Sequence, residues 1–189
     1  GPFTQADGAH VEKERASIYR AWRETDQLLS LISGINKDPH GRRHLVTAFN
    51  PGELDEMCLP PCHVMFQCFA SDLDKSYTRP RGSLDLQFYM RSLDLFIGAP
   101  FDIASYALLC HLLALATGRT ARRLIMTVGD AHIYNNHMAQ VDEVLSRPPL
   151  DLPGLWLSSA AHPLTFSPEE DAMLENYISH PAVPAPMNV

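Results

Sequence analysis

The sequence predicts an α+β fold in which helices flank one large mixed β-sheet. Several strand-like segments follow one another between a few helical segments, so the pattern is not a strict alternation of strand and helix. The chain has 189 residues, of which 46% are hydrophobic and 20% charged, as in a folded domain with a sizeable core. No internal repeat or low-complexity segment divides it. We therefore expect one domain over residues 1–189.

Residues 25–39 are expected to form a helix, because leucine and isoleucine recur there at helical spacing. The helix should begin at a capping Thr25 and stop at Pro39. After it, segments with alternating or β-branched residues predict the first strands. These strands cover 42–50, 62–72 and 83–92, with a turn-rich connection over 75–82.

An apolar run over residues 101–117 predicts a long buried helix. Asp102 stands near its start with Ser105 three residues on, and this pattern alone is typical of a helix cap. The rest of the chain predicts two further strands, another helix and an extended tail. The strands cover 122–130 and 154–159, the helix covers 131–147, and the proline-rich tail runs from residue 180 onward.

Charge and hydropathy narrow the range of partners. The formal net charge of −7 disfavours a general nucleic-acid surface, so we expect no nucleic-acid partner. No uninterrupted apolar stretch reaches membrane-spanning length, and the polar N-terminus does not resemble a signal peptide. We therefore expect a cytoplasmic protein without a membrane partner.

The four cysteines contain no C-x-x-C pair, which argues against a disulfide framework and against a zinc site. Free thiols in a reducing cytoplasm fit this spacing best. His132 and His137 lie five residues apart and do not share a helix face, which argues against a histidine metal pair. We predict that the protein holds no metal.

Three groups of polar residues are candidates for chemistry. Cys62 follows two prolines, and a nucleophilic cysteine needs nearby positive charge to stabilise its thiolate. Arg91 followed by Ser92 combines a charged fork with a hydroxyl, which suits a phosphate. His132 and Tyr134 stand at a predicted junction of strand and helix, where ligand groups often gather. The ordinary alternatives are a small buried cysteine and a solvated strand end.

Several segments occur in the order of the motifs of a known family. They are DPHGRRHLVTAFNPGELDEMCLPPCH, YMRSLDLFIGAPFDIASYALL and GDAHIYNNH, and the likeness returns at ENYISHPAVPAPMNV. Together they resemble the thymidylate synthase family, whose members share a cysteine after a proline and the segments R-S-x-D, G-x-P-F-N-I-A-S-Y and G-D-x-H-x-Y-x-N-H. The resemblance implies a homodimer of mixed sheets packed back to back. It also implies a pyrimidine nucleoside monophosphate as substrate and 5,10-methylenetetrahydrofolate as the one-carbon donor.

The resemblance further implies roles for single residues. Cys62 would attack C6 of the pyrimidine, which makes C5 nucleophilic, and Arg91 would help to hold Cys62 as a thiolate. The other expected contacts follow from position in the motifs. Arg91 and Ser92 would bind the 5′-phosphate, and Arg42 and Arg43 would bind the phosphate in the neighbouring subunit. His132 and Tyr134 would bind the sugar, and Asp94 would contact both substrate and folate. The folate would also contact Gly98, Trp22 and the tail that holds Asn188.

Asp102 departs from the family, whose members carry Asn at this position. An amide offers a donor and an acceptor, which matches uracil, whereas a carboxylate only accepts hydrogen bonds. Cytosine offers N4–H₂, and its N3 can be protonated once C6 has been attacked. The resemblance therefore favours the cytidylate 5-hydroxymethylases, which add water to the one-carbon intermediate. We predict CMP or dCMP as substrate, two nucleotides that the sequence does not separate.

The N-terminal part of the family pattern is the second departure. The arginine loop and the glutamate that the family carries there have no counterpart in residues 1–189. This departure keeps a non-catalytic nucleotide-binding relative as one alternative. A thymidylate synthase or a dCMP methylase of the same family is the other.

Overall fold

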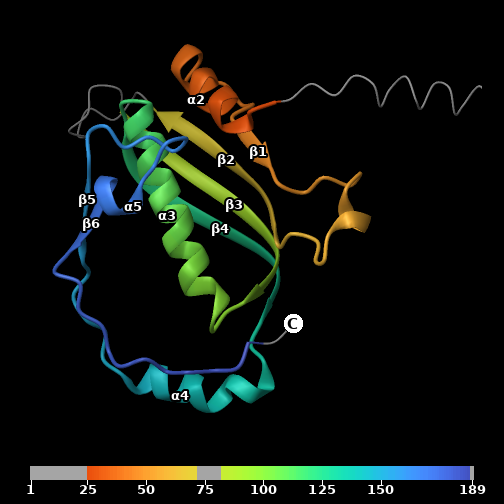
Figure 1. The fold of residues 1–189 in the computed structure, drawn as a ribbon, viewed down its shortest axis with the longest axis vertical. Helices are drawn as coiled ribbons and strands as arrows, with labels where there is room; N and C mark the ends of the chain where they lie inside the picture. Colours follow the sequence, from red (N-terminus) through yellow and green to blue (C-terminus); the bar gives the residue numbers. More distant parts are fainter. Residues whose placement is uncertain (1–24, 72–81, 188–189) are drawn as a thin grey trace, which may run out of the picture.

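The protein is a mixed β-sheet with helices beside it, as seen in a computed structural model that describes residues 25–71 and 82–187 (Figure 1). Four strands lie in the order β1-β2-β3-β4. The first two pairings are antiparallel, and β3 pairs with β4 in parallel. The predicted α+β class and mixed sheet are thus confirmed. The strands are β1 (Leu45–Thr47), β2 (His63–Ser71), β3 (Ser83–Asp94) and β4 (Thr120–His132).

Three sequence expectations fall outside the described residues in whole or in large part. They concern Trp22, Asn188 and the connection at 75–82, of which Gly82 alone is described. Gly82 has a φ of 84°, in the left-handed region that glycine adopts without a steric penalty. The chain therefore turns into β3 at a residue suited to the turn.

Helix α2 (Gln27–Lys37) packs against β1, and its buried apolar residues belong to the same core cluster as the sheet. The cap of this helix is Asp26, whose carboxylate accepts a hydrogen bond from the Leu29 N–H at 2.9 Å. The expectation that Thr25 is the cap is therefore wrong by one residue. The aspartate takes that place because its side chain satisfies an N–H that the first helical turn leaves free.

Helix α3 (Gly98–Ala116) begins three residues before the predicted start, which places Asp102 in its second turn. The turn before the helix is held by Asp94, whose Oδ1 accepts hydrogen bonds from the N–H groups of Phe96 and Ile97 at 2.9 and 3.4 Å. The interpretation of Asp102 as a helix cap is therefore wrong. The sequence pattern predicted the wrong helix start because the turn at Asp94 sets where the helix begins. The Asp102 carboxylate is therefore free of the capping role.

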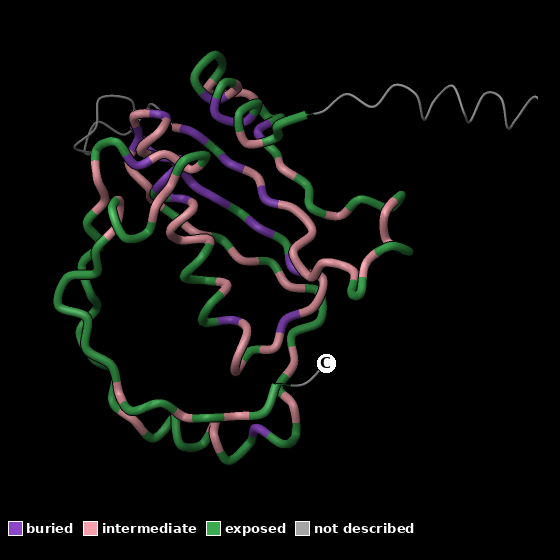
Figure 2. Tube along the Cα trace, in the orientation of Figure 1, coloured by how far each residue is buried: buried purple, intermediate pink, exposed green. Residues whose placement is uncertain are grey.

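One side of α3 covers a face of the sheet while its other side is exposed, as Figure 2 shows. Five of its 19 residues are buried, so the predicted buried helix is correct for one side alone. Phe101, on the exposed side, is 72% exposed. By length and composition α3 is the one helix in the described part of the chain that could cross a membrane, with a mean hydropathy of 1.5. Its inner side packs against β3 and β4.

The core lies between α3 and the inner face of β3. Leu84, Leu86, Phe88 and Met90 alternate with outward-facing residues along β3, and each is at most 2% exposed. Tyr106 of α3 stacks on Phe88, with ring centroids 3.9 Å apart and 11° between the ring planes. Burial stabilises the fold by about 1.5–3 kcal/mol for each large apolar side chain, so this layer fixes where α3 lies on the sheet.

The outer face of the sheet, opposite α3, carries side chains aligned across neighbouring strands. The register places Gln67 beside Gln87, and Gln87 beside Ile125. Gln87 Nε2 also donates to Thr127 Oγ1 at 3.3 Å. Phe69 and Ile125 on this face are 57% and 40% exposed. The outer face is thus an ordered surface of mixed polarity with exposed apolar side chains.

Strand β4 runs to His132, so the helix expected over 131–147 begins later than predicted. The ladder pairing of His132 with Asp94 extends the strand at the expense of the helix. A short 3₁₀ turn then leads into α4. The remaining elements are η1 (Leu54–Glu56), η2 (Asn135–His137), α4 (Met138–Ser146), β5 (Gly154–Leu157), α5 (Pro168–Asp171) and β6 (Ala172–Glu175).

The tail after β6 contains no helix or strand up to residue 187 and runs beside α4 (Figure 1). Three hydrogen bonds hold it. Arg147 Nη1 donates to Pro181 O at 2.7 Å, His180 Nε2 lies 2.9 Å from Pro148 O, and His137 Nε2 lies 2.8 Å from Pro186 O. The predicted extended tail is therefore confirmed for the part that is described.

Candidate active site

Most of the predicted site residues gather at one end of the four-stranded sheet, where β2 begins and β3 and β4 end. The Arg91 N–H donates to Cys62 O at 2.9 Å, which joins β3 to the residue just before β2. The parallel register places Asp94 beside His132, with Ser92 two residues earlier on β3. Ligands commonly bind at the carboxyl ends of parallel strands, because loops and side chains converge there. This end of the sheet is therefore the candidate active site.

Arg91 holds the segment before Cys62 in place. Its Nε donates to Pro61 O at 3.1 Å, and its Nη2 donates to Pro60 O at 2.6 Å. Cys62 is partly buried against the core cluster and is a free thiol. The arginine expected to bind a phosphate therefore also positions the expected nucleophile. Its side-chain hydrogen bonds to described residues use Nε and Nη2, and Nη1 is the nitrogen left for an anion.

Gly129 on β4 is required by the close approach of β3. A Cβ at this position would lie 2.8 Å from Arg91 O and 2.9 Å from Tyr89 Oη, both shorter than ordinary contacts. We expect Gly129→Ala to lower the free energy of unfolding by about 1–3 kcal/mol, because the Arg91 backbone must move. Unfolding in urea measures this change.

Gly98→Ala is the matched control for that measurement. A Cβ on Gly98 would have its nearest neighbours at 3.6–3.7 Å, which is ordinary van der Waals contact. This variant should keep or slightly raise the free energy of unfolding, because alanine favours the helix over glycine. A Gly129→Ala protein as stable as the wild type would contradict the constraint described here.

His132 and Tyr134 lie together at the same end of the sheet, with ring centroids 5.0 Å apart and 86° between the ring planes. His137 is fully buried, and its ring lies 5.6 Å from that of Tyr134 and 5.5 Å from that of Phe96. Because His137 also contacts Pro186 O, the pair expected to bind the sugar is connected to the tail. Sequence reasoning weighed His137 as a metal ligand and missed this packing role.

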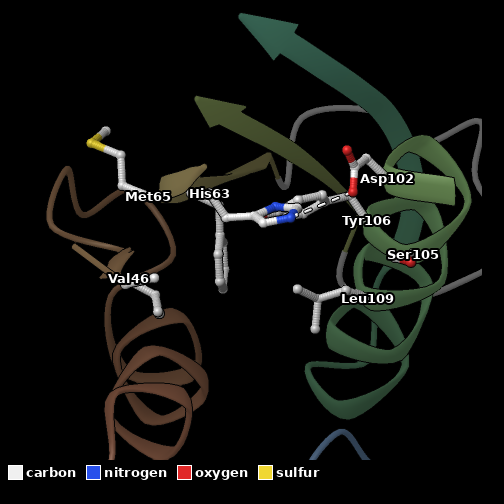
Figure 3. Close-up of a pocket in the computed structure, with 9 residues that line it drawn as sticks. Val46, His63, Met65, Asp102, Ser105, Tyr106 and Leu109 are labelled. Atoms are coloured by element: carbon white, nitrogen blue, oxygen red, sulfur yellow. Dashed lines mark ion pairs between the residues drawn. The ribbon is translucent and has the colours of Figure 1, made fainter. Parts of the chain in front are cut away.

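Asp102 opens on a cavity of about 370 Å³ that lies between β1, β2 and α3 (Figure 3). His63 reaches across from β2, and its Nε2 lies 3.4 Å from Asp102 Oδ1. The rest of the lining is mostly apolar. The volume is at the small end of the range for ligand sites, about 300–1,000 Å³. Cys62, although adjacent to His63 in the chain, does not line this cavity.

Asp102 also lies close to the two residues expected to contact the folate, Asp94 and Gly98. A Cβ on Gly98 would be 3.7 Å from Asp102 Oδ2 and 3.7 Å from Asp94 Cβ. The two oxygens of Asp102 therefore face different neighbours, with Oδ1 toward His63 and Oδ2 toward Gly98. Asp94 Oδ1 is committed to backbone N–H groups, so its Oδ2 is the freer oxygen for a ligand.

Burial raises the pKa of the Asp102 carboxyl above its ordinary value, and His63 lowers that pKa in part. Burial and the charge of Asp102 likewise raise the pKa of Tyr106, one helical turn later. Because folding raises the pKa of Asp102, the protonated carboxyl favours the folded state below its ordinary pKa. That contribution is lost as the pH rises through the folded value. An ionised Asp102 thus needs donors from a neighbour or a ligand.

Arg42 and Arg43 lie toward the other end of the sheet. His44 O accepts a hydrogen bond from the Cys68 N–H at 2.8 Å. This bond places the segment that holds Arg42 and Arg43 beside Cys68 of β2. Cys68 is six residues from Cys62, a separation of about 20 Å along an extended strand. The structure therefore does not bring Arg42 and Arg43 to the candidate site of their own chain.

Sequence reasoning missed His63 and Tyr106 as members of the site. Tyr106 follows Asp102 by four residues, so the two share a helix face, and this spacing was a usable signal. His63 had no comparable signal, because its contact with Asp102 joins residues that are far apart in the sequence. Within residues 25–71 and 82–187, no group of three histidine, cysteine or acidic side chains is arranged to hold a metal ion.

The arrangement and the motifs can be compared with known proteins. The family described as thymidylate synthase matches residues 4–189. A probable thymidylate synthase of Escherichia phage T5 is 47% identical over 176 residues, which cover 89% of this chain and 60% of that protein. The thymidylate synthase of Listeria monocytogenes is 43% identical over 185 residues, and that of Malacoplasma penetrans 42% over 174. These stretches cover 93% and 90% of this chain, and 56% and 57% of those relatives.

The fold and the matching motifs define a class of α+β proteins that are built on a mixed sheet flanked by helices. The chain belongs to the thymidylate synthase family. It spans up to about 60% of the length of the curated relatives that it matches.

Proposed function

We propose that this chain carries the catalytic centre of a transferase that moves a one-carbon unit from 5,10-methylenetetrahydrofolate to C5 of a cytidine monophosphate. Water then completes a 5-hydroxymethyl product. The observation that carries the proposal is Asp102, an acceptor-only side chain on a cavity of the size of a small ligand site. The named relatives support the coarser statement, a folate-dependent transfer to C5 of a pyrimidine nucleotide.

Cys62 supplies the covalent step. Its thiolate adds to C6 of the base, and the electron pair of the C5–C6 double bond makes C5 nucleophilic. C5 then bonds to the methylene carbon of the folate. Loss of the C5 proton and departure of tetrahydrofolate leave an exocyclic methylene group. Water adds to that group, and Cys62 is released from C6. Arg91 supports this step because it fixes the backbone before Cys62.

Asp102 supplies the choice of base. A carboxylate facing uracil meets O4, a second acceptor, with no proton between them. Facing cytosine, it accepts from N4–H₂ and from N3–H of the attacked ring. A mispaired buried polar contact costs about 1–3 kcal/mol, or roughly 5- to 150-fold in specificity. This difference favours cytosine over uracil.

A second copy of the chain is the proposed partner. The exposed side chains of the outer sheet face, Phe69 and Ile125 among them, provide a surface for back-to-back packing. Arg42 and Arg43 lie about 20 Å along the sheet from their own Cys62, so a phosphate contact from them requires another subunit. The free cysteines agree with a cytoplasmic location.

Release of tritium from C5-labelled nucleotides tests the proposed reaction. With methylenetetrahydrofolate present, we expect faster release from CMP or dCMP than from UMP or dUMP, and tetrahydrofolate as the folate product. Dihydrofolate formation with dUMP would assign the chain to methylation, as in the named relatives. Tight nucleotide binding without tritium release would identify a non-catalytic relative.

A further inference from the structure

His63 and Asp102 face each other across the cavity between β1, β2 and α3, one from the start of β2 and the other from the second turn of α3 (Figure 3). We propose that His63 is a positioning residue whose positive charge keeps Asp102 ionised, so that the proton shared with a cytosine stays on N3 of the base. This inference rests on the proposed function and names a further residue that determines its specificity.

The geometry fixes the direction of the Asp102 carboxylate. Oδ1 lies 3.4 Å from His63 Nε2, while Oδ2 faces Gly98 at the beginning of the helix. The side chain of Asp102 is 20% exposed and that of His63 is 43% exposed, so the pair lies at the mouth of the cavity and not in the core. A ligand can therefore reach the carboxylate while His63 still contacts it.

Tyr106 holds the His63 ring in that direction. The two ring centroids are 5.6 Å apart with 36° between the planes. Tyr106 is itself stacked on Phe88, a buried core residue of β3. His63 is thus connected to the sheet core through the ring of Tyr106.

The other groups around Asp102 in the described part of the chain supply no positive charge that would keep its carboxylate ionised. Tyr106 on α3 is neutral at physiological pH, because burial raises its pKa. Asp94, the last residue of β3, is acidic and lies near Gly98, on the side that Asp102 Oδ2 faces. The neighbouring Cys62 contributes no positive charge. Among the described ionisable groups that face Asp102, His63 is the one that can carry a positive charge.

The location of the shared proton has a chemical consequence. If Asp102 takes the proton, cytosine can still be bound, but its ring remains neutral. If His63 keeps Asp102 ionised, N3 carries the proton, and the ring draws electrons from C6, where the Cys62 thiolate must add. The charge of His63 should therefore act on turnover of cytosine nucleotides more than on their binding. Uracil already carries a proton on N3 and should be less affected.

His63→Gln is the test variant, since glutamine retains an N–H donor and loses the charge. We expect kcat for C5 tritium release from CMP or dCMP to fall on the order of tenfold, the effect of a shift of about one pKa unit. KM for the nucleotide should change much less. The dependence of kcat on pH should be weaker in His63→Gln than in the wild type. His111→Gln, a histidine on α3 that does not line the cavity, is the matched control.

Carboxyl-carbon nuclear magnetic resonance of Asp102 tests the same charge without turnover. Because His63 lowers the pKa of Asp102, His63→Gln should raise it further, whereas His111→Gln should not change it. His63→Asn provides a second variant if the glutamine protein does not fold. An unchanged Asp102 titration together with an unchanged kcat and pH profile would overturn the role of His63. A wild type that prefers uracil nucleotides would instead overturn the proposed function.

Discussion

Replacing Cys62 with serine is expected to lower exchange of the C5 proton of a cytidine monophosphate by more than about a thousandfold, while nucleotide affinity stays within a few fold of the wild type. Exchange requires a covalent bond at C6, and a serine hydroxyl is a much weaker nucleophile than a cysteine thiolate. The Arg91 hydrogen bonds to Pro60 and Pro61 do not involve the thiol, so the loop should keep its position. Tritium release and calorimetry measure the two quantities.

Cys58→Ser is the matched control, because Cys58 is an exposed free cysteine four residues before Cys62. The other two thiols are poor candidates for the nucleophile. Burial raises the pKa of Cys68 to about 12 and that of Cys110 to about 11, so both remain protonated at neutral pH. Exchange that persisted at a substantial fraction of the wild-type rate in Cys62→Ser would remove Cys62 from the mechanism.

Asp102→Asn is expected to shift the preference from cytosine toward uracil nucleotides by about tenfold to a thousandfold in relative kcat/KM. The amide supplies a donor toward O4 of uracil and removes one of the acceptors that cytosine requires. Asparagine is close in shape to aspartate, so the cavity should keep its form. Competition between labelled CMP and UMP, and between dCMP and dUMP, measures the ratio directly.

The same substitution has a predicted effect on stability. Because folding raises the pKa of Asp102, the ionised carboxylate disfavours the folded state at neutral pH, and an amide avoids this cost. Asp102→Asn should therefore not lower the free energy of unfolding at neutral pH. Asp142→Asn, the same change on the exposed side of α4, serves as control and should alter neither base preference nor stability. A cytosine-to-uracil ratio within about twofold of the wild type in Asp102→Asn would remove base recognition from Asp102.

The strands were predictable because alternation and β-branched residues are local signals, and in β3 the buried apolar residues from Leu84 to Met90 occupy every second position. Boundaries were less predictable. The start of α3 depends on Asp94, whose carboxylate bonds to the backbone of the following turn, and the sequence pattern placed the cap at Asp102 instead. The elements α5 and β6 were missed because each has four residues, too few to show a period.

The site was predictable as a set of residues but not as a set of contacts. Motif order placed Cys62, Arg91 and Asp94 in one site, and strand register brings them to one end of the sheet. The bonds of Arg91 to two proline carbonyls join residues 30 and 31 positions apart, which no local pattern reports. The contact between His63 and Asp102 depends in the same way on where α3 lies on the sheet, which is set by its packing against β3 and β4.

The position of the segment before β1 along strand β2 affects how the activity per chain depends on protein concentration. Arg42 and Arg43 lie about 20 Å along the sheet from Cys62 of the same chain. If each site takes a phosphate contact from another chain, the fraction of complete sites equals the fraction of chains that are paired. When the concentration of free chains equals half the dissociation constant of the pair, half of the chains are paired. Under the proposed arrangement, the number of finished sites therefore depends on protein concentration.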